Sequence, residues 1–142
     1  MDNVAQKTGQ ATALLPPGTR FVDSFIIDIN GMARGKRLTA AEWDAERGIS
    51  FSASALVLDA RGHAQGPLGI GATDGDPDAF GHPVPGGTVP VPWAEPGLVQ
   101  CLLSMHADGA PLWFDPRQIL ANVVTRCHAD GLFPVVACEL EF

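Results

Sequence analysis

Two segments on either side of Asn30-Gly31 most constrain how this chain can fold. Residues 21–29 are rich in β-branched and aromatic side chains, and the second segment covers residues 32–38. Asn-Gly supplies the two positive φ angles of a type I′ turn, so the pattern predicts a β-hairpin. Residues 1–19 are small and polar and lack the long apolar centre of a signal peptide, so we expect a loose tail there.

Shorter elements are predicted to follow the hairpin. Thr39 and Glu42 have the spacing of a capping box for a helix over 40–47, which Gly48 would end. Residues 54–60 are a further strand candidate. Residues 66–80 are dominated by Gly, Pro and Asp, which predicts a long exposed loop.

The second half of the chain has clearer patterns. Val and Pro alternate over 83–93, which excludes a central strand but allows an edge strand. Residues 98–106 have the composition of a buried strand, and Ala107-Asp108-Gly109 predicts a turn after it.

A helix is predicted to begin after Asp115, a good N-cap, with Pro116 at its first position. Apolar residues then share one face until Gly131 ends the helix, and residues 134–142 form a last strand. This order predicts an α+β fold, a β-grasp-like mixed sheet with helices packed on one face.

Charge and cysteine content exclude several classes of protein. The formal net charge is −7, with nine Lys and Arg against sixteen Asp and Glu, so we expect no nucleic-acid partner and no binding to anionic membranes. Three cysteines lie far apart in apolar contexts, which fits reduced core residues and a cytoplasmic location. No apolar run reaches membrane-spanning length.

Several motifs can be set aside. Residues 66–71 are glycine-rich, but no Lys-Ser or Lys-Thr follows them, so a nucleotide-binding loop is not predicted. The four histidines show no metal-ligand spacing, and no Ser, His and acid arrangement indicates a catalytic triad.

An acidic cluster lies at Asp74, Asp76 and Asp78. It lacks the glutamate and the flanking helices of an EF-hand, so a calcium loop is not predicted. Two interpretations stay open, a solvated turn or a loop that attracts a cationic substrate such as an amine.

Glu139 and Glu141 are spaced i, i+2, so on a strand both side chains would point to the same face. Paired carboxylates suit Mg²⁺ or Mn²⁺. The alternative is an edge strand with two solvated glutamates. Because a divalent ion usually needs more protein ligands or a bound phosphate, the pair would form at most part of a site.

Five motifs in this order resemble the amino-terminal part of the glutamine synthetase family, closest to its gamma-glutamylpolyamine or gamma-glutamylamine synthetase branch. The motifs are Asn30-Gly31 with Arg34-Gly35-Lys36, the acidic cluster 74–78, Pro90-Val91-Pro92-Trp93, Asp115-Pro116-Arg117 and Glu139-Leu140-Glu141-Phe142. The resemblance implies a β-grasp domain over 20–109 and, over 110–142, the start of a catalytic domain whose first strand carries E-x-E-F.

The resemblance also implies a chemistry. The family uses ATP to activate the gamma-carboxylate of glutamate, and ammonia or an amine then displaces phosphate. Glu139 and Glu141 would each bind one of two Mg²⁺ or Mn²⁺ ions. The other metal ligands and the ATP-binding and glutamate-binding residues would lie beyond Phe142, so the 142-residue chain alone is expected to be inactive.

The family forms homo-oligomeric rings in which the β-grasp domain closes the active site of the neighbouring subunit. Residues 51–81 would make that contribution, with Ser52, Asp76 and Asp78 as candidate catalytic residues. Family members that use ammonia carry F-D-G-S-S, and the matching residues here are Phe51-Ser52-Ala53-Ser54, so Ser52 replaces the acid. A neutral hydroxyl favours a primary amine or polyamine over ammonia. The alternative function is a freestanding β-grasp interaction module with exposed glutamates.

Overall fold

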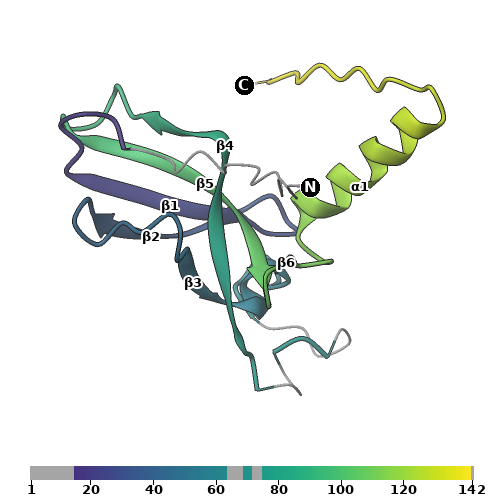
Figure 1. Ribbon diagram of the computed structural model, residues 1–142, viewed down its shortest axis with the longest axis horizontal. Coiled ribbons are helices and arrows are strands. Elements are labelled where there is room, and N and C mark those ends of the chain that lie inside the picture. The colour runs from purple at the N-terminus through teal and green to yellow at the C-terminus, as the bar shows by residue number, and fades with distance from the viewer. Residues whose placement is uncertain (1–14, 64–68, 72–74, 142) are drawn as a thin grey trace, which may run out of the picture.

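The computed structural model describes residues 15–63, 69–71 and 75–141, which are built around one mixed β-sheet (Figure 1). Its strands are β1 (Phe21–Ile27), β2 (Ala33–Thr39), β3 (Ile49–Ser52), β4 (Asp78–Pro90), β5 (Leu98–Ala107) and β6 (Ala110–Pro111). The order is β2-β1-β5-β4-β3, and β6 pairs with β5. Only β1 and β5 pair in parallel. With helix α1 (Pro116–Ala129) and the 3₁₀ turn η1 (Ala53–Leu56), this is the predicted α+β fold.

The sheet curls until its two outermost strands approach each other. Lys36 lies in β2 and Ser50 in β3, yet the Lys36 ammonium donates a hydrogen bond to the Ser50 carbonyl. The same ammonium lies 5.0 Å from the ring centre of Phe51. The concave face therefore encloses the core.

Alternating side chains of the central strands fill this core. In β5, every second residue from Val99 to Met105 is buried, as expected where one face of a strand packs inward. Leu56 and Val57 close the core from the η1 side. The buried strand predicted over 98–106 is thus confirmed as the centre of the sheet.

The β1–β2 hairpin is confirmed, but its predicted turn type is wrong. Ile27 pairs with Ala33, which leaves a five-residue loop in which Gly31 alone has a positive φ, of 77°. Asp28 Oδ1 accepts hydrogen bonds from the N–H groups of Asn30 and Met32 and so fixes a wider turn. Two successive positive φ angles occur instead at Asp108-Gly109, the predicted turn after β5.

The helix predicted over 40–47 is wrong, since the segment forms separate turns. The Thr39 N–H and hydroxyl do donate to the Glu42 carboxylate, as in a capping box. However, Asp44 Oδ1 accepts hydrogen bonds from the N–H groups of Glu46 and Arg47, and this local turn competes with a helix too short to offset its nucleation cost.

Two predicted strands are also wrong. Residues 53–56 form η1 where a strand was expected over 54–60. Residues 134–141 are extended but are not part of any sheet, and Val135 is 95% exposed. A strand needs a partner for its backbone groups, and within the described chain none lies beside this segment.

The proline-rich strand has the predicted edge character in part. β3 pairs only with the Asp78–Gly81 portion of β4, so in the described sheet the Pro83–Pro90 portion has β5 on one side and no strand on the other. An unpaired side tolerates proline, which has no N–H to donate. The predicted loop 66–80 is shorter than expected, because Asp78 to Phe80 already belong to β4.

Helix α1 begins and ends as predicted. Asp115 caps it by accepting a hydrogen bond from the Arg117 N–H, and Gly131 follows its end with a φ of 74°. The helix projects from the side of the sheet (Figure 1), and none of its residues is buried. Of the cysteines, only Cys101 is a core residue, whereas Cys138 is exposed. Among the helices of the described chain, none has the length and apolar composition needed to span a bilayer.

Candidate functional site

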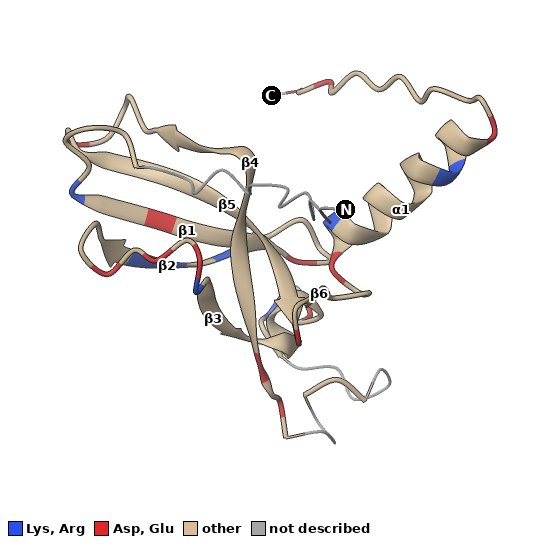
Figure 2. Ribbon diagram, viewed as in Figure 1, with Lys and Arg blue, Asp and Glu red and all other residues tan. Residues whose placement is uncertain are grey.

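Two of the predicted site residues lie together where β3 meets β4. Ser52 ends β3, Asp78 begins β4, and the two are direct partners in the antiparallel register. Direct partners place their side chains on the same face, so a hydroxyl and a carboxylate lie on one face of this edge. Both residues are exposed. Figure 2 shows acidic residues at this start of β4.

Asp76, the third predicted residue, faces the protein. Its Oδ1 accepts a hydrogen bond from the Ser54 N–H at 3.1 Å, and its Oδ2 accepts one from the Ser54 hydroxyl at 2.8 Å. Ser54 is only 5% exposed. Asp76 also holds a φ of 49°, which is uncommon for a residue other than glycine. We call this pair the Ser54–Asp76 clamp.

A third segment packs on the clamp. A Cβ atom at Gly71 would lie 2.7 Å from Ser54 Cβ and 3.3 Å from Asp76 Oδ1, so only glycine fits there. Next to the clamp, the Ala53 N–H donates to the Pro77 carbonyl at 3.1 Å. Segments far apart in sequence are thus fixed beside Ser52 and Asp78.

A second polar cluster holds the connection that leaves η1. Asn30 donates to the Leu58 carbonyl at 2.7 Å, and Arg34 donates to the Asp59 carbonyl at 3.3 Å and to Asp28 at 2.9 Å. Burial raises the pKa of Asp28, but hydrogen bonds from the Met32 N–H, Arg34 and the Asn30 N–H lower it more, so the pKa lies below its ordinary value. The carboxylate stays charged and anchors the β1–β2 loop.

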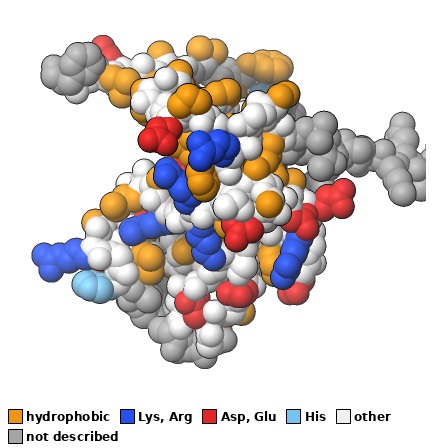
Figure 3. All heavy atoms as spheres, turned by 90° about the vertical axis from the view of Figure 1, so that its left-hand side faces the viewer, with side chains coloured by type: hydrophobic (Ala, Val, Ile, Leu, Met, Phe, Trp, Pro, Cys, Tyr) orange, Lys and Arg blue, Asp and Glu red, His pale blue; other side chains and the backbone are white. Residues whose placement is uncertain are grey.

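A hollow lies on the face of the sheet opposite the core. Its volume is about 440 Å³, and Gly35, Phe25 and Gln100 contribute to its lining together with an ion pair. In that pair Arg37 donates to both oxygens of Asp23, at 2.6 and 2.7 Å, which lowers the pKa of Asp23. Figure 3 shows Lys and Arg side chains through the middle of one side of the molecule, with Asp and Glu beside them.

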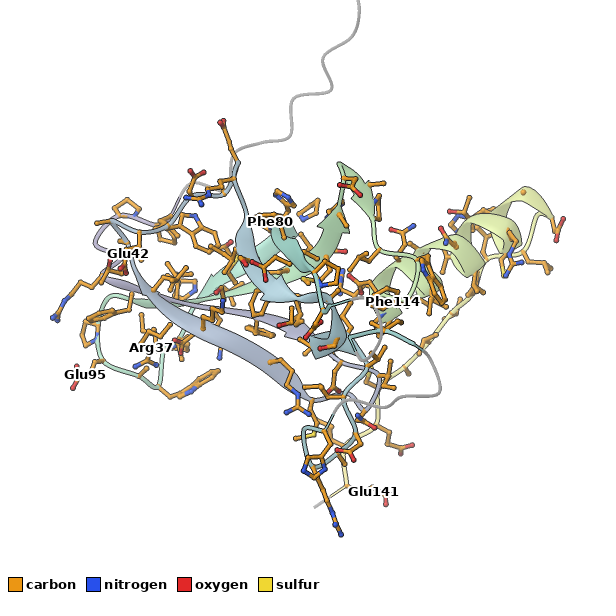
Figure 4. All side chains as sticks on the ribbon, turned by 90° about the horizontal axis from the view of Figure 1, so that it is seen from below. Arg37, Glu42, Phe80, Glu95, Phe114 and Glu141 are labelled. Atoms are coloured by element: carbon orange, nitrogen blue, oxygen red, sulfur yellow. The ribbon has the colours of Figure 1, made fainter. Side chains whose placement is uncertain are left out.

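The predicted metal ligands lie elsewhere. Glu139 and Glu141 are exposed on the extended segment after α1, and Figure 4 shows Glu141 well apart from Phe80 of β4. Their oxygen donors suit Mg²⁺ or Mn²⁺. Over residues 15–63, 69–71 and 75–141, however, no group of three or more His, Cys, Asp or Glu could hold a metal ion. The described residues therefore do not complete a metal site.

Sequence reasoning missed Ser54 and the Asp28–Arg34 anchor. Ser54 stands among small residues, and its partner Asp76 is 22 positions away, so no local pattern connects them. Arg34 belongs to one of the five motifs, but the motif does not predict its buried partner Asp28. Asp74, from the predicted acidic cluster, lies outside the described residues.

No protein-family model matches the chain, but individual proteins do. The gamma-glutamylputrescine synthetase PuuA of Escherichia coli (strain K12) is 40% identical over 129 residues, which is 89% of this chain and 27% of that protein. A glutamine synthetase of Pyrococcus abyssi (strain GE5 / Orsay) is 30% identical over 129 residues, which is 87% of this chain and 25% of that protein. The chain therefore spans about a quarter of the length of these relatives.

The fold is also found among solved structures. A crystal structure of a "novel glutamine synthase homolog" superposes with a TM-score of 0.64 and 23% identity, covering 82% of this chain and 28% of that one. At this identity the likeness establishes the shared fold.

Proposed function

Because the homologues of this chain are members of the glutamine synthetase family, we propose that it forms the amino-terminal part of an ATP-dependent ligase that joins glutamate to an amine. The observation that carries this proposal is the 40% identity to a gamma-glutamylputrescine synthetase across most of the chain. The larger remaining part of such an enzyme would supply the ATP and glutamate sites.

The proposal divides the chain into three parts. The predicted tail covers residues 1–19, of which residues 1–14 lie outside the described residues and Leu15 packs against the core. Residues 20–109 form a β-grasp domain, and residues 110–142 the start of the catalytic domain. Exposed apolar side chains after α1 support the last boundary, since Val135, Val136 and Leu140 are each at least 84% exposed and would be buried against a catalytic domain.

Ser52 and Asp78 are the residues we assign to the amine. In a homo-oligomeric ring the β3–β4 edge of one subunit would close the active site of its neighbour. The exposed Asp78 carboxylate attracts the cationic amine, and the neutral Ser52 leaves room for its organic group. The cationic amine loses one proton to water, and its neutral nitrogen bonds to the activated gamma-carbonyl carbon. The nitrogen then loses a second proton to water, the bond from that carbon to the phosphate oxygen breaks, and phosphate leaves.

Glu139 and Glu141 would provide two of the metal ligands of the full-length enzyme. Bound Mg²⁺ or Mn²⁺ neutralises phosphate charge in phosphoryl transfer. Because the described residues do not complete a metal site, we expect the 142-residue chain alone to be inactive. We place the enzyme in the cytoplasm, and the acidic charge of this chain supports the absence of a nucleic-acid or membrane partner for this part of it.

The test is phosphate release by the full-length enzyme with glutamate, ATP and either putrescine or ammonium. We expect a higher kcat/KM for putrescine. Ser52→Asp should shift the ratio toward ammonium, whereas Ser50→Asp, on the same strand, controls for an added charge. A wild-type enzyme that strongly prefers ammonium would overturn the amine assignment, and one without glutamate-dependent phosphate release would overturn the ligase assignment.

A further inference from the structure

We propose that Asp76 is a positioning residue that acts through Ser54, and that the Ser54–Asp76 clamp sets the affinity of the site for the amine. This inference rests on the proposed function, because it concerns how Ser52 and Asp78 are held. Asp76 was predicted to contact the substrate. In this proposal it instead supports the residues that make that contact.

The contacts of Asp76 are the first observation that supports the proposal. Both carboxylate oxygens accept hydrogen bonds from Ser54, and Ser54 is only 5% exposed. A charged acceptor forms stronger hydrogen bonds than a neutral one. The carboxylate therefore points at the protein, whereas that of Asp78 is exposed on the strand edge.

The position of the clamp in the chain is the second observation. Ser54 lies two residues after Ser52, and Asp76 lies two residues before Asp78. The pairing of Ser52 with Asp78 is the last of the β3–β4 register, and beyond it the Ala53 N–H to Pro77 carbonyl bond leads into the clamp. The end of a strand pair frays unless it is held. The Ser54–Asp76 clamp lies just beyond the last pair, Ser52 and Asp78, and so holds this end of the β3–β4 strand pair.

The backbone conformation of Asp76 is the third observation. Its φ of 49° is costly for a residue with a Cβ and persists only where surrounding contacts fix it. Gly71 packs so closely on both members of the clamp that no side chain fits between them. Loss of the Ser54 hydroxyl would release one of these contacts and let Asp76, Pro77 and Asp78 change direction.

The experiment compares variants of the full-length enzyme at saturating ATP and glutamate. Ser54→Ala should raise KM for the amine about tenfold, a factor that corresponds to about 1.4 kcal/mol, with kcat within about twofold of wild type. Asp76→Asn keeps an acceptor for the Ser54 N–H and gains a donor that can reach the Ser54 hydroxyl, so it should raise KM less than Ser54→Ala. Ser50→Ala is the matched control and should leave KM unchanged.

The double variant separates positioning from direct contact. If Asp76 acts through Ser54, the effects of Ser54→Ala and Asp76→Ala on KM should be less than additive in the double variant, because both changes remove the bond between the Ser54 hydroxyl and the Asp76 carboxylate. Additive effects, or a larger loss in Asp76→Asn than in Ser54→Ala, would show direct contact with the amine and overturn the inference. A change in thermal stability without a change in KM would also overturn it. A wild-type enzyme without ligase activity would overturn the proposed function and this inference together, whereas an active enzyme unaffected by Ser54→Ala overturns this inference alone.

Discussion

The carboxylate of Asp115 accepts a hydrogen bond at 2.8 Å from the backbone N–H of Met105, in the buried strand β5. The Ser104 hydroxyl donates to the same oxygen at 2.9 Å, and the Arg117 N–H donates to the other at 2.8 Å. One side chain, 2% exposed, therefore joins the start of α1 to the middle of the molecule. The helix is anchored by its N-cap, since none of its own residues is buried.

Asp115→Ala should lower the free energy of unfolding of the 142-residue chain by about 2–4 kcal/mol, because it leaves the Met105 N–H buried without an acceptor and removes the cap. Urea unfolding followed by circular dichroism measures this. Asp130→Ala is the control, because Asp130 is exposed at the other end of the helix, and it should change stability by less than about 0.5 kcal/mol. Equal losses in the two variants would contradict the anchoring role.

The start of α1 shows what sequence can predict. Asp115 and Pro116 act within one turn of the chain, so their pattern predicts the cap correctly. The bond from Met105 could not be predicted, because it depends on how β5 lies against the helix start. Local patterns also misled, since Asn30-Gly31 suggests a tight turn that the Asp28 carboxylate widens. The same limit applies to the candidate site. The pairing of Ser52 with Asp78 and the Ser54–Asp76 clamp form only when segments distant in sequence meet.

Acid should weaken the fold through Asp28. The pKa of this carboxyl is lower in the folded chain than its ordinary value of 3.8, so below about pH 4 the unfolded chain binds more protons than the folded chain. The contribution of Asp28 is therefore complete above that pH and is lost as the pH falls through the folded pKa. The stability difference between wild type and Asp28→Asn should shrink from pH 7 to pH 3.

Urea unfolding at pH 7, 5, 4 and 3 measures the Asp28 effect. Asp130→Asn removes the same charge without removing the hydrogen bonds from Asn30, Met32 and Arg34, and it reports the effect of net charge alone. A difference between wild type and Asp28→Asn that stays constant with pH would contradict the assignment.

Two glycines on β2 and its preceding turn should differ in their tolerance of alanine. A Cβ at Gly35 would clash with the Ser24 carbonyl oxygen, so Gly35→Ala forces the backbones of β1 and β2 apart and should lower the free energy of unfolding by at least about 2 kcal/mol. A Cβ at Gly31 meets nothing within 4 Å, so Gly31→Ala should cost only about 1 kcal/mol, for its φ of 77°. Thermal unfolding of the two variants tests this order, and the reverse order would contradict it.

Metal binding by the 142-residue chain should be weak. Glu139 and Glu141 lie on an exposed segment, and no third donor joins them in the part of the chain that the structure describes. Two solvated carboxylates without supporting hydrogen bonds do not replace the water shell of Mg²⁺ or Mn²⁺. Calorimetric titration should give a dissociation constant weaker than about 1 mM. Glu139→Gln should therefore behave like the control Glu95→Gln. Micromolar binding that Glu139→Gln abolishes would mean that the chain holds a complete site by itself.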